Sequence, residues 1–282
     1  MTDDVETNYR AILDSHSMVL AEQDTALLAR PELRPVRMQL ELLKPELALA
    51  EQRIQSTIVV FGGTQIRERH EAEALLRTAR EAATADPANK DHKRAVARCE
   101  RLLAKSHFYD QAREFTRLIS TVGQCDGPRD FVVVTGGGPG IMEAANRGAF
   151  DVNAKSIGLN IQLPAEQSPN PYITPDLCFQ FHYFALRKLH FLLRAKALVV
   201  FPGGFGTIDE MFDALTLRQT RRMQVIQIIL FVRAYWERAI DFQFLADEGV
   251  IADEHLSLLS FAESPQEIVD VILRFHAEGS AS

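Results

Sequence analysis

The sequence predicts an α/β protein in which helices cover both faces of a parallel sheet. Short apolar stretches of about four to six residues alternate along the chain with longer stretches of helical periodicity. Two of the apolar stretches run directly into glycine-rich turns, and a helical pattern follows each turn. Strands that are apolar over their whole length are typical of parallel sheets buried on both sides.

The expected strands and helices follow one another in order. Each expected strand is a short, largely apolar stretch, and glycine-containing turns close three of them. Strands are expected at Thr57–Phe61, Phe131–Val134, Ser156–Ile161, Ala197–Phe201 and 225–231. Helices are expected over 67–121, from Ile141 to Ala149, over 183–196, over 234–247 and from Pro265 to His276. The first of these stretches should be broken near Asp86–Pro87, and a proline-rich loop is expected over 164–181.

The two ends of the sequence differ in character. Residues 1–55 carry no strand signal and are expected to form an N-terminal helical extension, broken near Pro31 and Pro35. The extension either packs on its own domain or serves as an oligomer contact. Residues 56–282 are expected to form the α/β domain. The charged stretch over about 68–105 is expected to form solvent-exposed helices that extend from this domain.

Composition narrows the class of protein. The chain has 282 residues, of which 46% are hydrophobic and 24% charged, as in ordinary globular proteins. A formal net charge of −7 argues against a broad nucleic-acid surface. No apolar run approaches the roughly 20 residues that span a bilayer, and the acidic start argues against a signal peptide. Three widely spaced cysteines are expected to be reduced thiols of a cytoplasmic protein.

The turn over Pro202–Thr207 is the most informative segment. It lies between an expected strand and an expected helix and contains Gly203, Gly204 and Gly206. Glycines let backbone N–H groups approach a phosphate closely, and a helix N-terminus adds roughly half a positive charge there. The segment therefore predicts binding of a phosphorylated small molecule.

The second turn comprises Gly136, Gly137, Gly138, Pro139 and Gly140. The dinucleotide pattern G-x-G-x-x-G fails here, because Ile141 or Glu143 stands where its last glycine would be. The pattern G-x-x-x-x-G-K-[ST] of ATP-hydrolysing proteins is absent as well. Ligands of open α/β sheets bind beyond the carboxyl ends of the strands, so the two turns together favour one ligand site. We expect neither a cofactor nor a metal.

Two acidic residues near these turns have a structural and a functional interpretation. Glu210 fits a capping box that begins at Thr207, but it also lies one turn into the helix that faces the expected phosphate. Glu143, which follows the other turn, has the same two interpretations: it either stabilises the start of its helix or faces the ligand. Arg187 and Lys188 lie within an apolar helical pattern, either on its solvated face or as a cation pair beside an anionic ligand.

Taken together, these residues resemble the LONELY GUY family of phosphoribohydrolases, which is also labelled "possible lysine decarboxylase". The resemblance rests on the segment Gly136–Ala144, on Arg187-Lys188 and on the segment Pro202–Glu210, and it covers about Thr57 to Phe275. Ala185 and Leu186 stand where members that act on cytokinin nucleotides carry His-Glu, so the chain looks like the longer bacterial branch.

The resemblance implies a Rossmann-like, doubly wound sheet, a homodimer or higher homo-oligomer, and a nucleotide-binding catalytic domain. The implied reaction is hydrolysis of the N-glycosidic bond of a nucleoside 5′-monophosphate, AMP-like or a cytokinin riboside 5′-monophosphate, to a free base and ribose 5-phosphate. Arg187 and Glu210 would be the catalytic pair. The implied substrate and phosphate contacts would come from the two glycine turns and their neighbours: Gly136, Gly137, Gly138, Gly140, Glu143, Lys188, Gly203, Gly204, Gly206 and Thr207.

Two other classes of function remain open from the sequence. Related carrier proteins for molybdenum cofactor share the fold and the glycine turns, so a non-catalytic carrier is the alternative hypothesis. A regulatory oligomer that senses nucleotide is a third hypothesis. Lysine decarboxylation is disfavoured, because no recognisable lysine site for pyridoxal phosphate is present.

Overall fold

The structure is a computed structural model that describes residues 2–124, 127–162 and 168–279. By its internal contacts the chain divides into two units, residues 1–44 and residues 45–282. The division falls inside helix α3 (Arg34–Glu51), at Pro45. The expected boundary near residue 55 stays a prediction.

The first unit consists of helices and turns. Its elements are α1 (Thr2–Leu13), η1 (His16–Met18), α2 (Thr25–Ala29), η2 (Pro31–Leu33) and the first part of α3. Asp24 begins α2, because its carboxylate accepts the Leu27 N–H at 2.8 Å. The helical character expected of this segment is confirmed.

The second unit is built on seven parallel strands in the order β4-β3-β2-β1-β5-β6-β7. The strands are β1 (Thr57–Phe61), β2 (Val132–Thr135), β3 (Ser156–Ile161), β4 (Cys178–Phe181), β5 (Ala195–Val200), β6 (Gln227–Phe231) and β7 (Leu259–Ala262). The strand order reverses at β1, which pairs with β2 on one side and with β5 on the other. Such a reversal opens a crevice beyond the carboxyl ends of the two strands.

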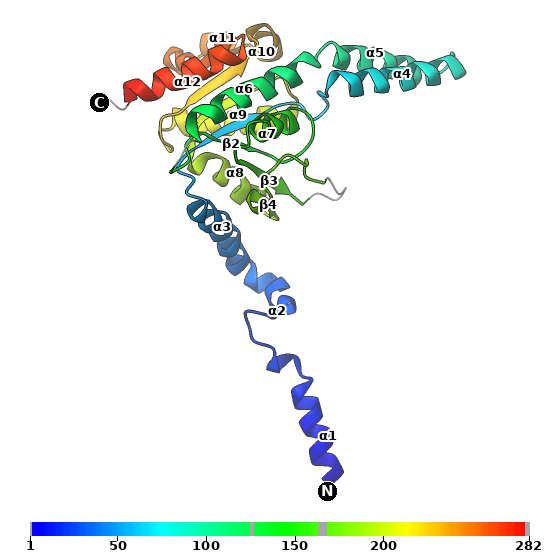
Figure 1. Ribbon diagram of the computed structural model, residues 1–282, viewed down its shortest axis with the longest axis vertical. Coiled ribbons are helices and arrows are strands. Elements are labelled where there is room, and N and C mark those ends of the chain that lie inside the picture. The colour runs from blue at the N-terminus through cyan, green and yellow to red at the C-terminus, as the bar shows by residue number, and fades with distance from the viewer. Residues whose placement is uncertain (1, 125–126, 163–167, 280–282) are drawn as a thin grey trace. The chain divides into compact units, whose positions relative to one another are not determined.

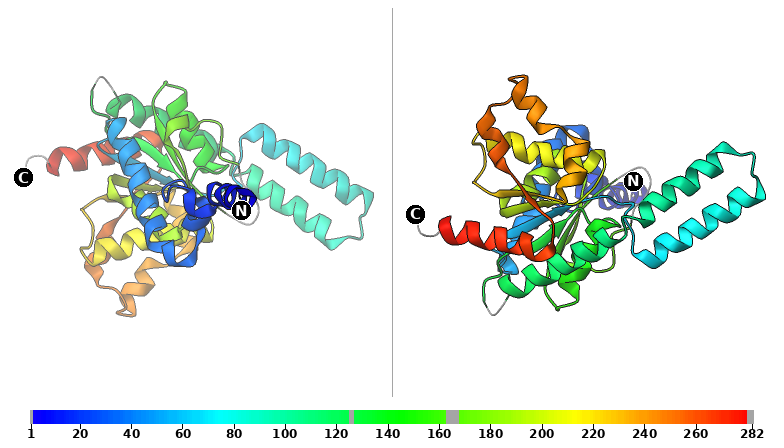
Figure 2. Two further views of the ribbon diagram at one scale, coloured as in Figure 1. Left: turned by 90° about the horizontal axis from the view of Figure 1, so that it is seen from below. Right: turned by 90° about the horizontal axis from the view of Figure 1, so that it is seen from above.

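Helices cover both faces of the sheet, as expected (Figures 1 and 2). Ile58 and Val60 of β1 point into a core shared with one helical layer, whereas Phe61 packs edge to face on Phe191 in the other layer. The first layer contains α6 (His107–Gly123), α7 (Ile141–Phe150) and α12 (Pro265–Gly279), and the second contains α8 (Phe184–Leu193) and α9 (Phe205–Gln219). The prediction of a doubly wound α/β sheet is confirmed.

A helical hairpin extends from the sheet between β1 and α6 (Figures 1 and 2). Its helices are α4 (Arg69–Ala85) and α5 (Lys90–Leu103). The break falls at Asp86–Asn89, and the Asn89 side chain caps α5 by accepting the Asp91 N–H at 2.9 Å. The helices and the break expected in this stretch are therefore present.

Several elements differ from the expected ones, and a second break, between α5 and α6, was not expected. Strand β4 lies inside the stretch expected to be a proline-rich loop, and β7 was not expected at all. Helix α8 ends at Leu193 rather than near residue 196, because Ala195 and Lys196 already belong to β5. The helix expected over 234–247 is two helices, α10 (Arg233–Ala239) and α11 (Phe242–Asp247), since Asp241 caps the second.

The remaining short helices are η3 (Pro175–Leu177) and η4 (Asp253–Leu258). Across the described residues, no helix combines the length and the apolar character that crossing a bilayer requires.

Candidate functional site

A cavity of about 300 Å³ lies at the carboxyl edge of the sheet, where the strand order reverses. The turn after β1 forms one wall, and the start of α9, which follows β5, forms another. Arg187 of α8 and Met142 of α7 complete the lining. The volume is at the lower end of the range for small-molecule sites. The complete lining is Phe61, Gly62, Gly63, Thr64, Met142, Arg187, Gly204, Phe205, Gly206, Thr207 and Glu210.

The N-terminus of α9 opens into this cavity. The helix has 15 residues, begins at Phe205, and has Gly204 as its N-cap. Within the described residues no side chain caps it, so its first backbone N–H groups are available to a ligand. A Cβ added at Gly204 or Gly206 would meet no atom within 4 Å, which shows that both residues face open space. This geometry suits an anion.

The start of α9 also settles the capping question for Glu210. Because the helix begins two residues before Thr207, Thr207 is not the N-cap and the capping box does not form. Instead, the Glu210 carboxylate faces the cavity, and its Oε1 lies 3.5 Å from Nη1 of Arg187. The two side chains that the resemblance pairs are therefore adjacent, each 12% exposed.

Arg187 is fixed from several sides. Its Nε donates to the carbonyl of Leu159 on β3 at 2.7 Å, and its guanidinium lies over the Phe191 ring, 5.0 Å from the centroid. A Cβ added at Gly136 would lie 2.5 Å from Nη2 of Arg187. The guanidinium thus occupies space that only glycine at position 136 leaves free.

Burial perturbs both charged groups of this pair. It raises the pKa of Glu210 to about 7, although the positive charges of Arg187 and Lys188 act in the opposite direction. Burial also lowers the pKa of Arg187, opposed by the charge of Glu210. Arginine still remains protonated at neutral pH. A carboxylate with a pKa near neutrality in a cavity is typical of catalytic sites.

The second glycine turn lies behind Arg187 rather than on the cavity wall. Gly137 and Gly140 have φ angles of 77° and 73°, which favour glycine. The buried Asn170 holds the turn, because its Nδ2 donates to the carbonyls of Gly137 and Gly138 at 3.1 Å each. The turn therefore positions the guanidinium, and its predicted contact with substrate stays a prediction.

Two other predicted site residues have protein partners. Glu143 accepts a hydrogen bond from the Tyr109 hydroxyl at 2.8 Å. Lys188 forms ion pairs with two carboxylates of α9. Its Nζ lies 2.9 Å from the Asp209 carboxylate and also contacts that of Asp213. Neither residue is part of the cavity lining.

Of the predicted site residues, the structure brings together Arg187, Glu210, Gly204, Gly206 and Thr207. Gly203 lies directly behind Thr207 and does not reach the cavity. The sequence analysis did not count Gly62, Gly63 and Thr64 among the site residues. The signal was present, since they form a third glycine-containing turn directly after a buried strand.

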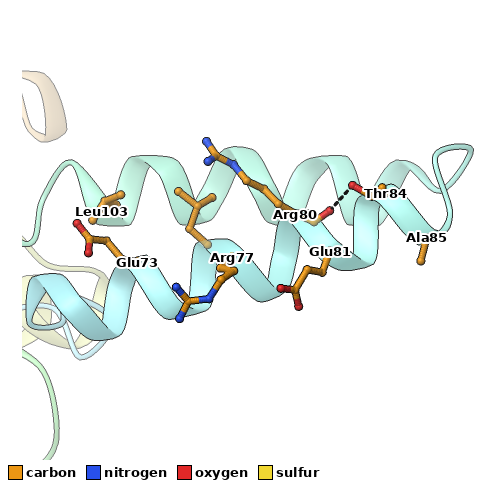
Figure 3. Close-up of a pocket in the computed structure, with 8 residues that line it drawn as sticks. Glu73, Arg77, Arg80, Glu81, Thr84, Ala85 and Leu103 are labelled. Atoms are coloured by element: carbon orange, nitrogen blue, oxygen red, sulfur yellow. Dashed lines mark hydrogen bonds between the residues drawn. The ribbon is translucent and has the colours of Figure 1, made fainter.

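A larger hollow of about 760 Å³ runs along the projecting hairpin (Figure 3). Seven of its eight lining residues come from α4 alone, and Leu103 of α5 is the eighth. Two arginines and two glutamates of α4 line it, and the Thr84 hydroxyl donates to the Arg80 carbonyl of its own helix. All of its polar lining residues come from α4, and one of them, Arg80, pairs with Glu100 of α5 at 2.8 Å. Over residues 2–124, 127–162 and 168–279, no group of three or more His, Cys, Asp or Glu side chains is placed to hold a metal.

Comparison with known proteins agrees with the expected resemblance. The chain is 31% identical to "Pyrimidine/purine nucleotide 5'-monophosphate nucleosidase" of Escherichia coli (strain K12), over 39% of this chain and 26% of that protein. The same values hold for the protein of that name in Escherichia coli O157:H7. The chain thus matches only about a quarter of the length of these curated relatives.

Some solved structures are similar to this chain at low identity. One is the molybdenum cofactor binding protein of Rippkaea orientalis, with 21% identity, coverage of 60% of this chain and 87% of that chain, and a TM-score of 0.41. Another is the Moco carrier protein of Chlamydomonas reinhardtii, with 15% identity, coverage of 79% and 99%, and a TM-score of 0.48.

A family model described as "Possible lysine decarboxylase" matches residues 142–272. The matched region begins at Met142 on the cavity wall and includes both Arg187 and Glu210. The predicted resemblance is thereby confirmed over this region, which is similar to the family described as "Possible lysine decarboxylase".

Proposed function

We propose that the protein hydrolyses the N-glycosidic bond of a nucleoside 5′-monophosphate and releases the free base and ribose 5-phosphate. The observation that carries this proposal is the Arg187–Glu210 pair, 3.5 Å apart, in a cavity that the uncapped N-terminus of α9 also lines. The start of α9, which suits an anion, and the Glu210 carboxylate, whose pKa is raised, thus line the same small cavity. The relatives named as nucleotide 5′-monophosphate nucleosidases support the same class of reaction.

Cleavage of an N-ribosyl bond builds positive charge on C1′ and on the ring oxygen of the ribose. A carboxylate beside C1′ stabilises that charge, as in glycoside hydrolysis, and Glu210 is the candidate for this role or for orienting the attacking water. Arg187 orients the nucleotide or assists departure of the base. The phosphate at the start of α9 acts as a remote handle, whose binding energy positions C1′.

The phosphate handle provides a direct test of this proposal. AMP and adenosine present the same base and the same scissile bond, but only AMP offers an anion to the start of α9. Adenosine should therefore be a very poor substrate, with kcat/KM lower than that of AMP by at least about 100-fold, because the remote binding energy is lost. Comparable release of adenine from the two compounds, measured by liquid chromatography, would contradict the proposal.

Binding without base release is the competing outcome. A protein that binds nucleoside monophosphates in a calorimeter but releases no base from any of them would be a carrier or a sensor. The choice of base, whether adenine, guanine, a pyrimidine or a prenylated adenine, is decided by the same screen of nucleotides.

A further inference from the structure

Tyr235 contacts the turn before α9 from outside the cavity. Its hydroxyl donates a hydrogen bond to the carbonyl of Gly203 at 2.7 Å. Gly203 in turn packs so closely on the Thr207 side chain that a Cβ at position 203 would overlap it. Because Thr207 lines the cavity, any shift of Gly203 would be transmitted to the cavity wall.

The Tyr235 ring is itself held in place. It belongs to α10 and packs at 85° on the ring of Trp236, with 5.2 Å between the ring centroids. Trp236 is fully buried, and its Nε1 donates to the carbonyl of Phe231 at 3.1 Å. The hydroxyl therefore approaches Gly203 from a rigid support.

The backbone that leads into α10 is strained. Val232 has a φ of 68° and a ψ of 91°, a conformation that a β-branched residue rarely adopts. Two hydrogen bonds hold it: its N–H donates to Ala262 at 2.9 Å, and its carbonyl accepts the N–H of Tyr235 at 3.1 Å. Strained residues of this kind cluster where a structure must aim a functional group.

We propose that Tyr235 is a positioning residue that sets the N-terminal turn of α9 for phosphate. This inference rests on the proposed function, since it concerns the same anion site. The strained backbone at Val232 orients Tyr235. The Tyr235 hydroxyl holds the Gly203 carbonyl by a hydrogen bond, and Gly203 in turn packs against Thr207.

Tyr235→Phe removes the hydroxyl and keeps the ring. Loss of one hydrogen bond at the phosphate turn should raise KM for the nucleotide by about 3- to 10-fold and leave kcat within about twofold. Inhibition by inorganic phosphate should weaken by the same factor, whereas inhibition by the free base should not change. Tyr172→Phe is the matched control, because it removes a hydroxyl from a ring that lies over Arg147 rather than at the cavity.

Amide hydrogen exchange provides a second readout that needs no substrate. Faster exchange in Y235F confined to the first hydrogen-bonded amides of α9, beginning with the Ile208 N–H that donates to the Gly204 carbonyl at 3.0 Å, supports the positioning role. Equal acceleration in the neighbouring strands β1 and β5 would overturn it and indicate a purely structural role.

The two proposals fail in different ways. If the wild-type protein hydrolyses the nucleotide and Y235F has the same KM and the same phosphate inhibition, the role of Tyr235 is refuted while the proposed function stands. If the wild-type protein neither releases base nor binds phosphate or a nucleoside monophosphate, both proposals are overturned.

Discussion

Gly136 lies away from the cavity wall but packs directly against Arg187, which lines it. A side chain at this position would enter the space of the Arg187 guanidinium. Gly206, by contrast, faces open space beside the cavity. The sequence grouped these glycines together as phosphate contacts. It could not separate them, because a glycine needed for packing and a glycine needed for ligand access look identical in the chain.

Gly136→Ala should displace Arg187 and reduce kcat/KM by about 100-fold or more, because displacements near 1 Å have effects of this size. Gly206→Ala is the matched control for folding, since its methyl group meets no protein atom. Both variants should unfold within a few degrees of the wild type in a thermal melt. A Gly136→Ala variant with full activity would show that the position of Arg187 does not matter.

Glu210 determines how the reaction should depend on pH. Its pKa is raised to about 7 by burial, so the side chain is mostly neutral below this pH and mostly ionised above it. The proposed role beside C1′ requires the carboxylate. The value of kcat/KM should therefore rise with pH, about tenfold per unit well below pH 7, and level off above it. A rate that falls through the same range would indicate that Glu210 acts as a proton donor instead.

At the scale of elements, helices α8 and α9 supply the two charged groups of the site and are tied together by Lys188. The lysine on α8 pairs with Asp209 and Asp213 on α9, on either side of Glu210 in the sequence. Its positive charge lowers the pKa of Glu210, and the two aspartates raise it. The contact between the helices therefore also adjusts the chemistry of the site.

Lys188→Met should shift the midpoint of the pH–rate profile to higher pH, because a charge that favours the Glu210 carboxylate is lost. Asp213→Asn should shift the midpoint to lower pH, because a charge that opposes the carboxylate is lost. The two profiles are measured on kcat/KM with one nucleotide. Shifts in the same direction would contradict this account of the electrostatics.

The sequence predicted the central elements well and the peripheral ones less well. Strands β1 and β3 occur at their expected residues, because both are short, largely apolar stretches between helical patterns. The four-residue strands β4 and β7 were missed, since pairing with a neighbouring strand defines them more than their own composition does. The start of α9 removes Glu210 from the expected capping box. It lies three residues before the start that the box implied, a shift that sequence patterns do not resolve.

At the scale of the whole molecule, the cavity depends only on residues of the second unit. Every residue of its lining lies between Phe61 and Glu210, and the strand reversal at β1 explains its position. The sequence predicted that ligands bind beyond the strand ends, but it could not predict strand order. That order results from packing between elements distant in the chain.

Two truncations test where the second unit begins. A chain starting at Pro45 keeps Leu49, Ile54 and the bond from Arg194 Nη2 to the Glu46 carboxylate at 2.6 Å, so it should keep both stability and activity. A chain starting at Ser56 loses these contacts. It should be less stable by about 3 to 6 kcal/mol, from the burial of two large apolar side chains, as measured by urea unfolding. Equal stability of the two chains would move the boundary towards residue 55.

The central claim is tested most directly by incubating the purified protein with a panel of nucleoside monophosphates, including isopentenyl-AMP, and separating the products by liquid chromatography. The account predicts release of free base and ribose 5-phosphate from at least one nucleotide, and loss of this release in a Glu210→Ala variant that folds normally and still binds the nucleotide. Nucleotide binding without base release by the wild-type protein, or full activity in the folded Glu210→Ala variant, would contradict it.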